Sequence, residues 1–198
     1  MKTFLTIFSM FLLVSCGDDN PGNQPDTTTL PEPVVESAGN TPVLYAEFNT
    51  SITIRDVMNT FIDPSADALW QAVRFEMDAT GAHEVVPETE EEWEALRKHA
   101  ISIIEGANAL MIPGRHVAAP GSTTEFPAYE YLPEEVEAKL AEDRLSWLGF
   151  AQSLQTSAFS VMGAINARDV TRLGETGGLV DQACENCHSQ YWYRTESL

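Results

Sequence analysis

Apolar residues recur at alternating spacings of three and four along most of the chain beyond about residue 50, and this period predicts α-helices. The first such stretch ends near Val73 and is interrupted at Asp63-Pro64. Aspartate can cap a helix and proline suits a first helical turn, so we expect a kink or a break at this dipeptide. The apolar face of this stretch consists of Ile54, Val57, Met58, Phe61, Ile62, Leu69 and Val73.

Three further helices follow in the sequence. Thr89 and Glu92 form a capping-box pattern that starts the second helix, and Pro113 ends it before a loop rich in proline and glycine over residues 113–132. The third stretch begins at Pro133. It would be about 35 residues long, which is unusual for one helix of a bundle, so we expect a break near Asp143.

Asp169 can cap a fourth helix that carries the apolar residues Leu173, Val180 and Ala183. We find no convincing strand. The pattern therefore predicts an all-α fold, an up-down-up-down four-helix bundle over residues 50–198.

Residues 1–15 predict a secretory signal, because Lys2 precedes an apolar run that ends in the small residue Ser15. A short membrane anchor and a buried helix are the alternatives, but the run is too short to span a bilayer comfortably. The next residue, Cys16, completes a sequence that resembles the bacterial lipoprotein cleavage box. That resemblance implies a lipidated Cys16 and a lasting anchor to the inner or outer membrane, with the protein on the periplasmic side.

Residues 16–49 are rich in Pro, Asp, Asn, Thr and Gly and predict a flexible tether behind the lipidated cysteine. The alternative for the end of this segment is that the apolar residues around Tyr45 and Phe48 dock on the domain.

The chain is strongly acidic, with 11 Lys and Arg against 30 Asp and Glu and a net charge of −19. Loss of residues 1–15 would remove one base, Lys2, and no acid. This charge argues against nucleic acid or an anionic lipid surface as the main partner, and favours a protein with a basic docking surface.

The sequence Cys184-Glu185-Asn186-Cys187-His188 lies near the end of the predicted last helix and has the spacing of haem c attachment. Two cysteines three apart lie on nearly the same helical face, so both thiols can form thioethers to one porphyrin. The neutral imidazole of His188 is a good iron ligand.

Two other interpretations of Cys184 and Cys187 are a disulfide and a redox or zinc pair. His83, His99 and His116 form no second paired motif for zinc. A thioredoxin-like pair would prefer the start of a helix, where the helix dipole lowers the thiol pKa.

With this motif at its C-terminal end and Arg55 and Met58 on its first helix, the chain resembles the class II c-type cytochromes, the cytochrome c′ family, over residues 50–192. The resemblance extends to Tyr191, three residues after His188. It implies one covalent haem c at one end of the bundle, with the first helix on the distal side. Low-spin members of the family place a ligating methionine there.

An up-down bundle puts the end of its fourth helix beside the start of the first and the end of the second. Met58 and Met111 are at that end, whereas Met77 and Met162 are not. Met58 is our predicted second iron ligand. Met111, His116 and an open iron position remain alternatives.

Other residues have weaker predicted roles. Arg55 can neutralise a haem propionate, although an exposed helix arginine is equally ordinary. Trp147 can pack on the porphyrin or simply fill the core, and Tyr191 and Trp192 can fold over the haem edge. Five-coordinate family members usually carry a basic residue where Trp192 stands.

A histidine and methionine pair would saturate the iron, so we expect an electron-transfer protein. The alternative is a cytochrome that binds nitric oxide or carbon monoxide for sensing or detoxification. We expect no enzyme, because the sequence offers no distal His and Arg pair to activate an oxidant. Association into a homodimer is left open.

Overall fold

The computed structural model describes residues 48–194, which belong to the compact unit Ala46–Leu198. The predicted signal peptide, Cys16 and nearly all of the predicted tether lie outside the described residues. The described chain is mainly helical, as the sequence predicts. None of its helices combines the length and the apolar character of a membrane span.

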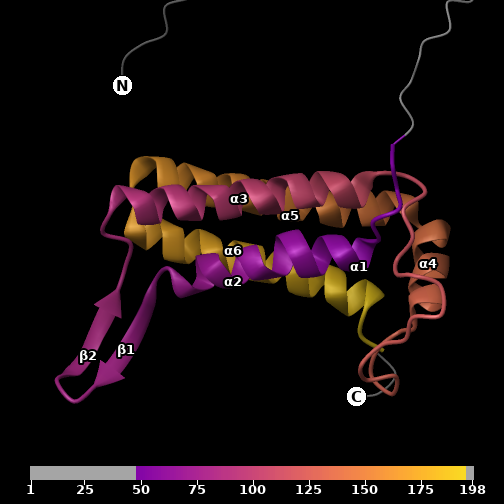
Figure 1. The fold of residues 1–198 in the computed structure, drawn as a ribbon, viewed down its shortest axis with the longest axis horizontal. Coiled ribbons are helices and arrows are strands. Elements are labelled where there is room, and N and C mark those ends of the chain that lie inside the picture. The colour runs from indigo at the N-terminus through magenta and orange to yellow at the C-terminus, as the bar shows by residue number, and fades with distance from the viewer. Residues whose placement is uncertain (1–47, 195–198) are drawn as a thin grey trace, which may run out of the picture. The chain divides into compact units, whose positions relative to one another are not determined.

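The elements follow one another as helices with one short hairpin. Their bounds are α1 (Ile54–Val57), a π-helical turn η1 (Met58–Ile62), α2 (Asp63–Gln71), β1 (Arg74–Asp78), β2 (Gly81–Val85), α3 (Glu90–Met111), α4 (Pro133–Glu142), α5 (Arg144–Ala167) and α6 (Val170–Tyr191). The long helices run side by side, α4 crosses one end of them, and the hairpin projects at the other end (Figure 1).

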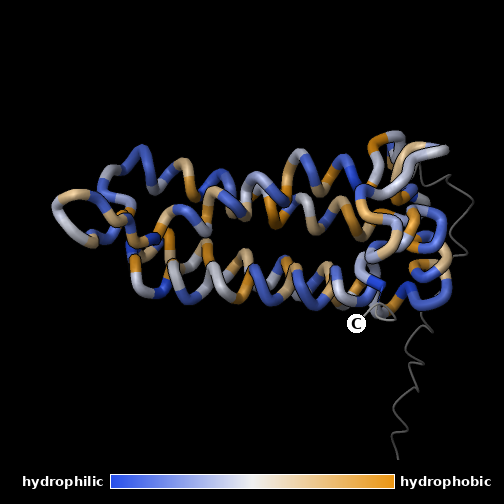
Figure 2. The backbone as a smooth tube through the Cα atoms, turned by 90° about the horizontal axis from the view of Figure 1, so that it is seen from below, coloured by the Kyte–Doolittle hydropathy of each residue, from blue (hydrophilic) through white to orange (hydrophobic). Residues whose placement is uncertain are grey.

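The helices bury a shared apolar core. Helix α3 packs against α5, α5 packs against α6, and α2 touches both α3 and α6. Apolar positions recur on the sides of the helices that face one another (Figure 2). The largest fully buried side chains are Ile103, Ile165, Leu173, Val57, Val161 and Val180.

Local capping sets the starts of the long helices, as the sequence predicts. The Thr89 hydroxyl accepts the Glu92 N–H at the start of α3. Asp143 breaks the third stretch between α4 and α5, and its carboxylate accepts the N–H of Ser146. Asp169 caps α6 in the same way. Each cap satisfies a backbone donor that a helix leaves free in its first turn.

The β-hairpin corrects the expectation of an all-α chain. Strands β1 and β2 pair antiparallel, with Asp78 opposite Gly81. The carboxylate of Asp78 accepts the N–H of Thr80 at 2.7 Å, and Gly81 has a φ of 125° that glycine tolerates best. Apolar residues alternate with polar ones along β1, but every side chain of this strand is exposed. The alternation of apolar and polar residues was therefore too short to predict a strand, and no buried face accompanied it.

The first predicted helix is interrupted by a π-helical turn immediately before Asp63-Pro64. The Asp63 N–H donates to the Met58 carbonyl five residues back. Pro64 has no N–H to continue an α-helical ladder, which favours irregular bonding at this point. Val57 and Ile62, also five residues apart, are both buried, at 2% and 3% exposure. The wider turn lets both residues face the core.

Close packing against Ile62 predicts that Gly106→Ala destabilises the protein. A Cβ at Gly106 would lie 2.6 Å from the Ile62 Cγ1 atom. Overpacking strain of about 1–3 kcal/mol should outweigh a helix-propensity gain of about 1 kcal/mol. We expect the free energy of unfolding, measured with urea, to fall by roughly 1 kcal/mol.

Gly149→Ala is the matched control, because a Cβ at this exposed position of α5 would meet nothing within 4 Å. It should raise the free energy of unfolding by up to about 1 kcal/mol. Equal stabilisation by both substitutions would contradict close packing at Gly106.

The cap of α3 predicts an acid-sensitive contribution to stability. Backbone N–H groups of Thr89 and Glu88 donate to the Glu92 carboxylate and lower its pKa from 4.5. A lowered folded-state pKa gives stabilisation that is present above pH 4.5 and is lost as the pH falls through the folded value. Glu92→Gln should therefore lower the melting temperature at pH 7, and the difference from the wild type should shrink below pH 4.5.

Glu91→Gln is the control, since it removes the same charge from the same turn but leaves the capping bonds of Glu92 in place. An equal pH-dependent effect of both variants would show that helix-dipole charge, not the cap, is responsible.

Candidate functional site

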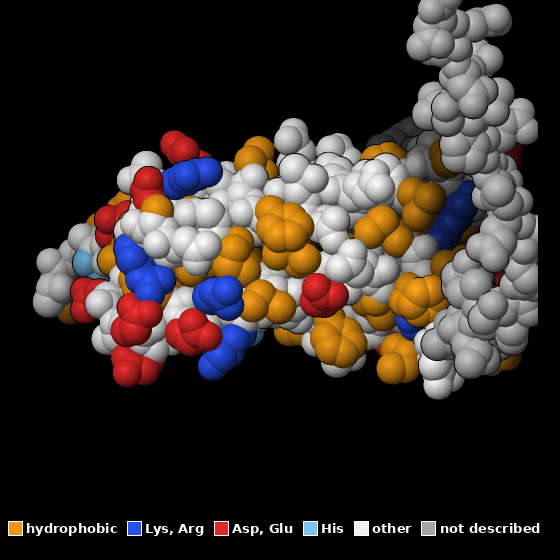
Figure 3. Space-filling model, turned by 90° about the horizontal axis from the view of Figure 1, so that it is seen from above, with side chains coloured by type: hydrophobic (Ala, Val, Ile, Leu, Met, Phe, Trp, Pro, Cys, Tyr) orange, Lys and Arg blue, Asp and Glu red, His pale blue; other side chains and the backbone are white. Residues whose placement is uncertain are grey.

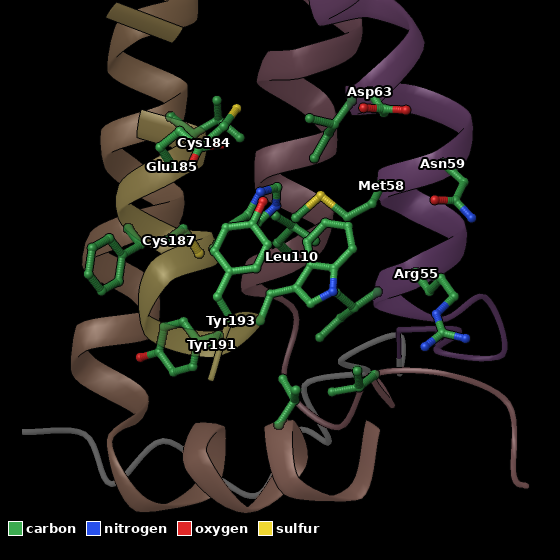
Figure 4. Close-up of a pocket in the computed structure, with 18 of the residues that line it drawn as sticks. Arg55, Met58, Asn59, Asp63, Leu110, Cys184, Glu185, Cys187, Tyr191 and Tyr193 are labelled. Carbon is green, nitrogen blue, oxygen red and sulfur yellow. The ribbon is translucent and has the colours of Figure 1, made fainter. Parts of the chain in front are cut away.

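A cavity of about 650 Å³ opens among the helices near the C-terminal end of α6. Helix α6 forms one wall, α1 with η1 and the start of α2 forms the facing wall, and α5 and α3 contribute side chains between them (Figure 4). Its volume lies within the usual range of ligand pockets, about 300–1,000 Å³.

The α6 wall presents the predicted attachment residues together. Cys184, Cys187 and His188 all line the cavity and are partly buried. Cys184 and Cys187 are free thiols. Because α6 is continuous from Val170 to Tyr191, these side chains share one stretch of helical surface.

Burial changes the protonation of this wall. It raises the pKa of the Cys184 thiol to about 11, with help from the charges of Asp181 and Glu185, and raises the pKa of the Cys187 thiol to about 12. Burial also lowers the pKa of His188, against the opposing charges of Glu185 and Asp63. At neutral pH both thiols are protonated and the imidazole is neutral, with a lone pair free to bind a metal.

Met58 stands on the facing wall, where η1 begins. Its thioether extends across the cavity toward the helix that carries Cys184 and Cys187 (Figure 4). Arg55, one turn earlier, also lines the cavity, and its guanidinium donates to the Thr123 carbonyl at 2.9 Å. Both residues therefore lie at the cavity, and their roles toward a haem stay predictions.

Aromatic side chains line the cavity where α5 begins and α6 ends. Trp147 is buried and its indole N–H donates to the Leu110 carbonyl at 2.9 Å. The Tyr191 ring packs edge-on against Trp147 and Phe150, at centroid distances of 5.3 and 5.8 Å. Within residues 48–194 the buried Tyr191 hydroxyl finds no hydrogen-bond partner. The hydroxyl points away from Cys187 and Met58 in Figure 4, so the ring of Tyr191 rather than its hydroxyl faces the cavity.

The chain end folds over His188. The Trp192 ring lies 4.8 Å from the imidazole and stacks on Tyr193. Arg194 pairs with Glu135 at 2.5 Å and donates to the Glu130 carbonyl at 2.9 Å. Arg194 is thus bound to the loop before α4 and to the first turn of α4. The aromatic pair beside His188 is Trp192 and Tyr193, whereas the sequence suggested Tyr191 and Trp192.

The other candidate ligands lie elsewhere. Among the described methionines, Met58 lines the cavity, whereas Met77 is exposed in the hairpin at the opposite end, and Met111 and Met162 are not part of the lining. His116 is exposed and its Nδ1 lies 3.1 Å from the Glu137 carboxylate. The structure therefore leaves His188 and Met58 as the facing pair.

Sequence reasoning missed several residues of the cavity. Leu110 and Phe150 line it from α3 and α5, and Tyr193 reaches into it from the chain end (Figure 4). The negative charge of Asp63 contributes to raising the pKa of Cys184 and opposes the lowering of the pKa of His188. The helical stripe could have suggested Leu110, but no sequence signal marked the other residues.

No protein-family model, characterised protein or solved structure matches the chain. In residues 48–194 no group of three or more His, Cys, Asp or Glu side chains gathers as a metal-ion site would require. Chemically, the cavity offers two thiols for covalent attachment, one imidazole nitrogen and one thioether sulfur on opposite sides, and an aromatic lining.

Proposed function

We propose that this protein is a periplasmic c-type cytochrome of class II, low-spin type, which carries one covalent haem c and transfers electrons. The observation that carries the proposal is the opposition of two walls across one cavity. Cys184, Cys187 and His188 stand on one wall, and Met58 points toward them from the other.

The residues present fit such a group. The cavity volume of about 650 Å³ suits a ligand of this size. Aromatic and aliphatic side chains of the lining suit a flat apolar macrocycle, and Arg55 suits its propionates. The lining also includes carboxylates, at Asp63, Glu125, Glu130, Asp181 and Glu185. Haem c, when bound, supplies an iron that gains or loses one electron.

Each residue has a distinct role in this proposal. Cys184 and Cys187 would hold the group covalently, and His188 and Met58 would ligate the iron from its two sides. Arg55 would pair with a propionate, which a guanidinium can do through two parallel hydrogen bonds. Trp147 and Tyr191 would pack beside the macrocycle and keep water from it.

The proposal extends to the fold and the location. The side-by-side packing of α2, α3, α5 and α6 supports an up-down-up-down four-helix bundle of the class II type. Lipidation at Cys16 would hold the bundle at a bacterial membrane. A net charge of −19 supports a redox partner with a basic docking surface and an encounter that weakens as salt rises.

The test uses the mature protein made in a host with haem-attachment machinery. We expect a coloured protein whose mass exceeds that of the mature lipidated polypeptide by one haem, and sharp low-spin absorption bands that do not change with carbon monoxide. A colourless protein of unmodified mass would refute haem attachment. A high-spin spectrum with ready carbon monoxide binding would instead support the gas-binding alternative.

A further inference from the structure

Four aromatic side chains form an exposed patch at the end of the bundle that holds the cavity. Phe126 and Tyr129 are 55% and 63% exposed, and Trp192 and Tyr193 are 42% and 38% exposed. The two segments lie together, because Glu130 and Tyr193 form an antiparallel bridge. We call Phe126, Tyr129, Trp192 and Tyr193 the aromatic patch.

Several backbone donors of the aromatic patch are already satisfied within the protein. The N–H of Tyr129 donates to the Phe126 carbonyl at 2.8 Å. The N–H of Trp192 donates to the His188 carbonyl at 2.7 Å, and across the bridge the N–H of Arg194 donates to the Tyr129 carbonyl at 2.7 Å. Covering the patch therefore leaves none of these donors unpaired, which removes a common cost of burying polar groups.

The aromatic patch is uncharged although the chain is strongly acidic. Residues 126–133 contain one charged residue, Glu130, and it is buried. Residues 189–193 contain none, and Arg194 after them is paired with Glu135. An uncharged, exposed cluster that includes Trp and Tyr side chains is typical of a surface that contacts another protein.

The aromatic patch also touches the proposed iron ligand. The Trp192 ring lies edge-on to the His188 imidazole at a centroid distance of 4.8 Å, and it stacks on the Tyr193 ring at 5.6 Å. His188 in turn lines the cavity. An electron that leaves the cavity through His188 would therefore cross one indole ring to reach the surface.

Carboxylates border the aromatic patch. Glu125 directly precedes Phe126, is exposed and lines the cavity. Burial raises the pKa of Tyr193 and the negative charge of Glu185 adds to this effect, which places the exposed Glu185 near the patch. Basic side chains around an apolar contact face would meet these carboxylates favourably.

The hairpin end of the bundle lacks this combination. Phe75 and Met77 are exposed there too, but they lie at the end opposite the cavity (Figure 1). On the face shown in Figure 3, basic side chains lie among the acidic ones toward that end. A basic partner would meet both signs of charge at the hairpin end, far from the cavity.

We propose that the aromatic patch is the docking surface for the redox partner, a one-electron carrier protein whose apolar contact face is ringed by Lys and Arg. This proposal rests on the proposed haem. One electron passes between the two proteins, so one cofactor is oxidised as the other is reduced, and no bond or proton is exchanged. A patch of four side chains suits the small, short-lived contacts that electron-transfer proteins make.

Chemical-shift mapping tests the docking itself. The isotope-labelled, reduced holoprotein is titrated at low salt with unlabelled, reduced mitochondrial cytochrome c, a basic one-electron carrier. Backbone signals of Phe126, Tyr129 and Trp192 should shift, whereas those of β1 and β2 should not. Unchanged signals in the patch, or equal shifts in the hairpin, would overturn the proposal.

A pair of substitutions tests the contribution of the patch to electron exchange. Phe126→Ser with Tyr129→Ser should lower the stopped-flow rate constant for exchange with this probe by about tenfold or more. Phe75→Ser with Met77→Ser is the matched control, because it removes two exposed apolar side chains from the hairpin, and it should leave the rate unchanged. Acetylation of the probe's lysines removes their positive charge and should slow the wild-type reaction. Equal rates for the two double variants would contradict docking at the patch.

Exchange with hexaammineruthenium(II), a complex too small to need a docking face, separates docking from damage at the haem. Its rate constant should be the same for the wild type and for Phe126→Ser with Tyr129→Ser, and an equal loss with both reagents would overturn the proposal. Absorption spectra are recorded first. A colourless wild type would refute the proposed function and this proposal with it, whereas a coloured one with unchanged rates refutes docking alone. If the patch variant keeps its rates but no longer binds phosphatidylcholine vesicles, the patch faces lipid and the proposal is wrong.

Discussion

Replacing both Cys184 and Cys187 by serine is expected to abolish covalent haem binding. The two thiols line one cavity from one helix. We propose that the covalent bonds to haem form at these two cysteines and nowhere else. Denaturing electrophoresis with haem staining and the intact mass should both show a polypeptide without haem, while the wild type retains it. A double variant that kept its haem through denaturation would refute attachment at this motif.

Cys16→Ser is the matched control for that experiment. It removes the third cysteine of the chain, the predicted lipid acceptor, and should leave haem staining intact while the lipid mass disappears. Loss of haem in this variant as well would show that general effects on export or folding, not the attachment motif, explain the result.

The second large effect is expected at Met58. Met58→Ala should convert a low-spin iron into a high-spin one and allow carbon monoxide to bind, because it removes the thioether that faces the His188 wall. Absorption spectra of the oxidised and reduced holoproteins would measure the change. An unaltered coordination state in the variant would exclude Met58 as the ligand.

Met111→Ala provides the comparison, since this methionine lies near the same end but does not line the cavity. Its spectrum should equal that of the wild type. A spectral change in Met111→Ala with none in Met58→Ala would move the ligand to α3.

Local signals made much of the fold predictable. The caps at Thr89, Asp143 and Asp169 act within one helical turn, so the residues that form them are visible in the sequence. The hairpin was not predicted, because its strands are short and β1 has no buried side. Nor was the π-helical turn, which depends on how Val57 and Ile62 pack against other helices.

For the candidate site too, local features were predictable from the sequence, whereas contacts between distant residues were not. The attachment motif is a local pattern. Helix order put both Met58 and Met111 at its end of the bundle, and the resemblance to class II cytochromes favoured Met58. The cover over His188 depends instead on contacts across long stretches of chain, such as the bond from Arg194 to the Glu130 carbonyl. Ligation by Met58 and the propionate contact of Arg55 stay predictions.

The π-helical turn at Met58–Ile62 fixes how α1 is rotated relative to α2, and so which side chains this wall presents to α6. An α-helix advances about 100° per residue, so one residue more or less in that turn would rotate the stretch before it relative to α2. Single-residue insertions and deletions here would therefore change which side chain faces His188, while α2 keeps its register in the core. Such length changes offer a route by which related chains can exchange one distal side chain for another without rebuilding the rest of the protein.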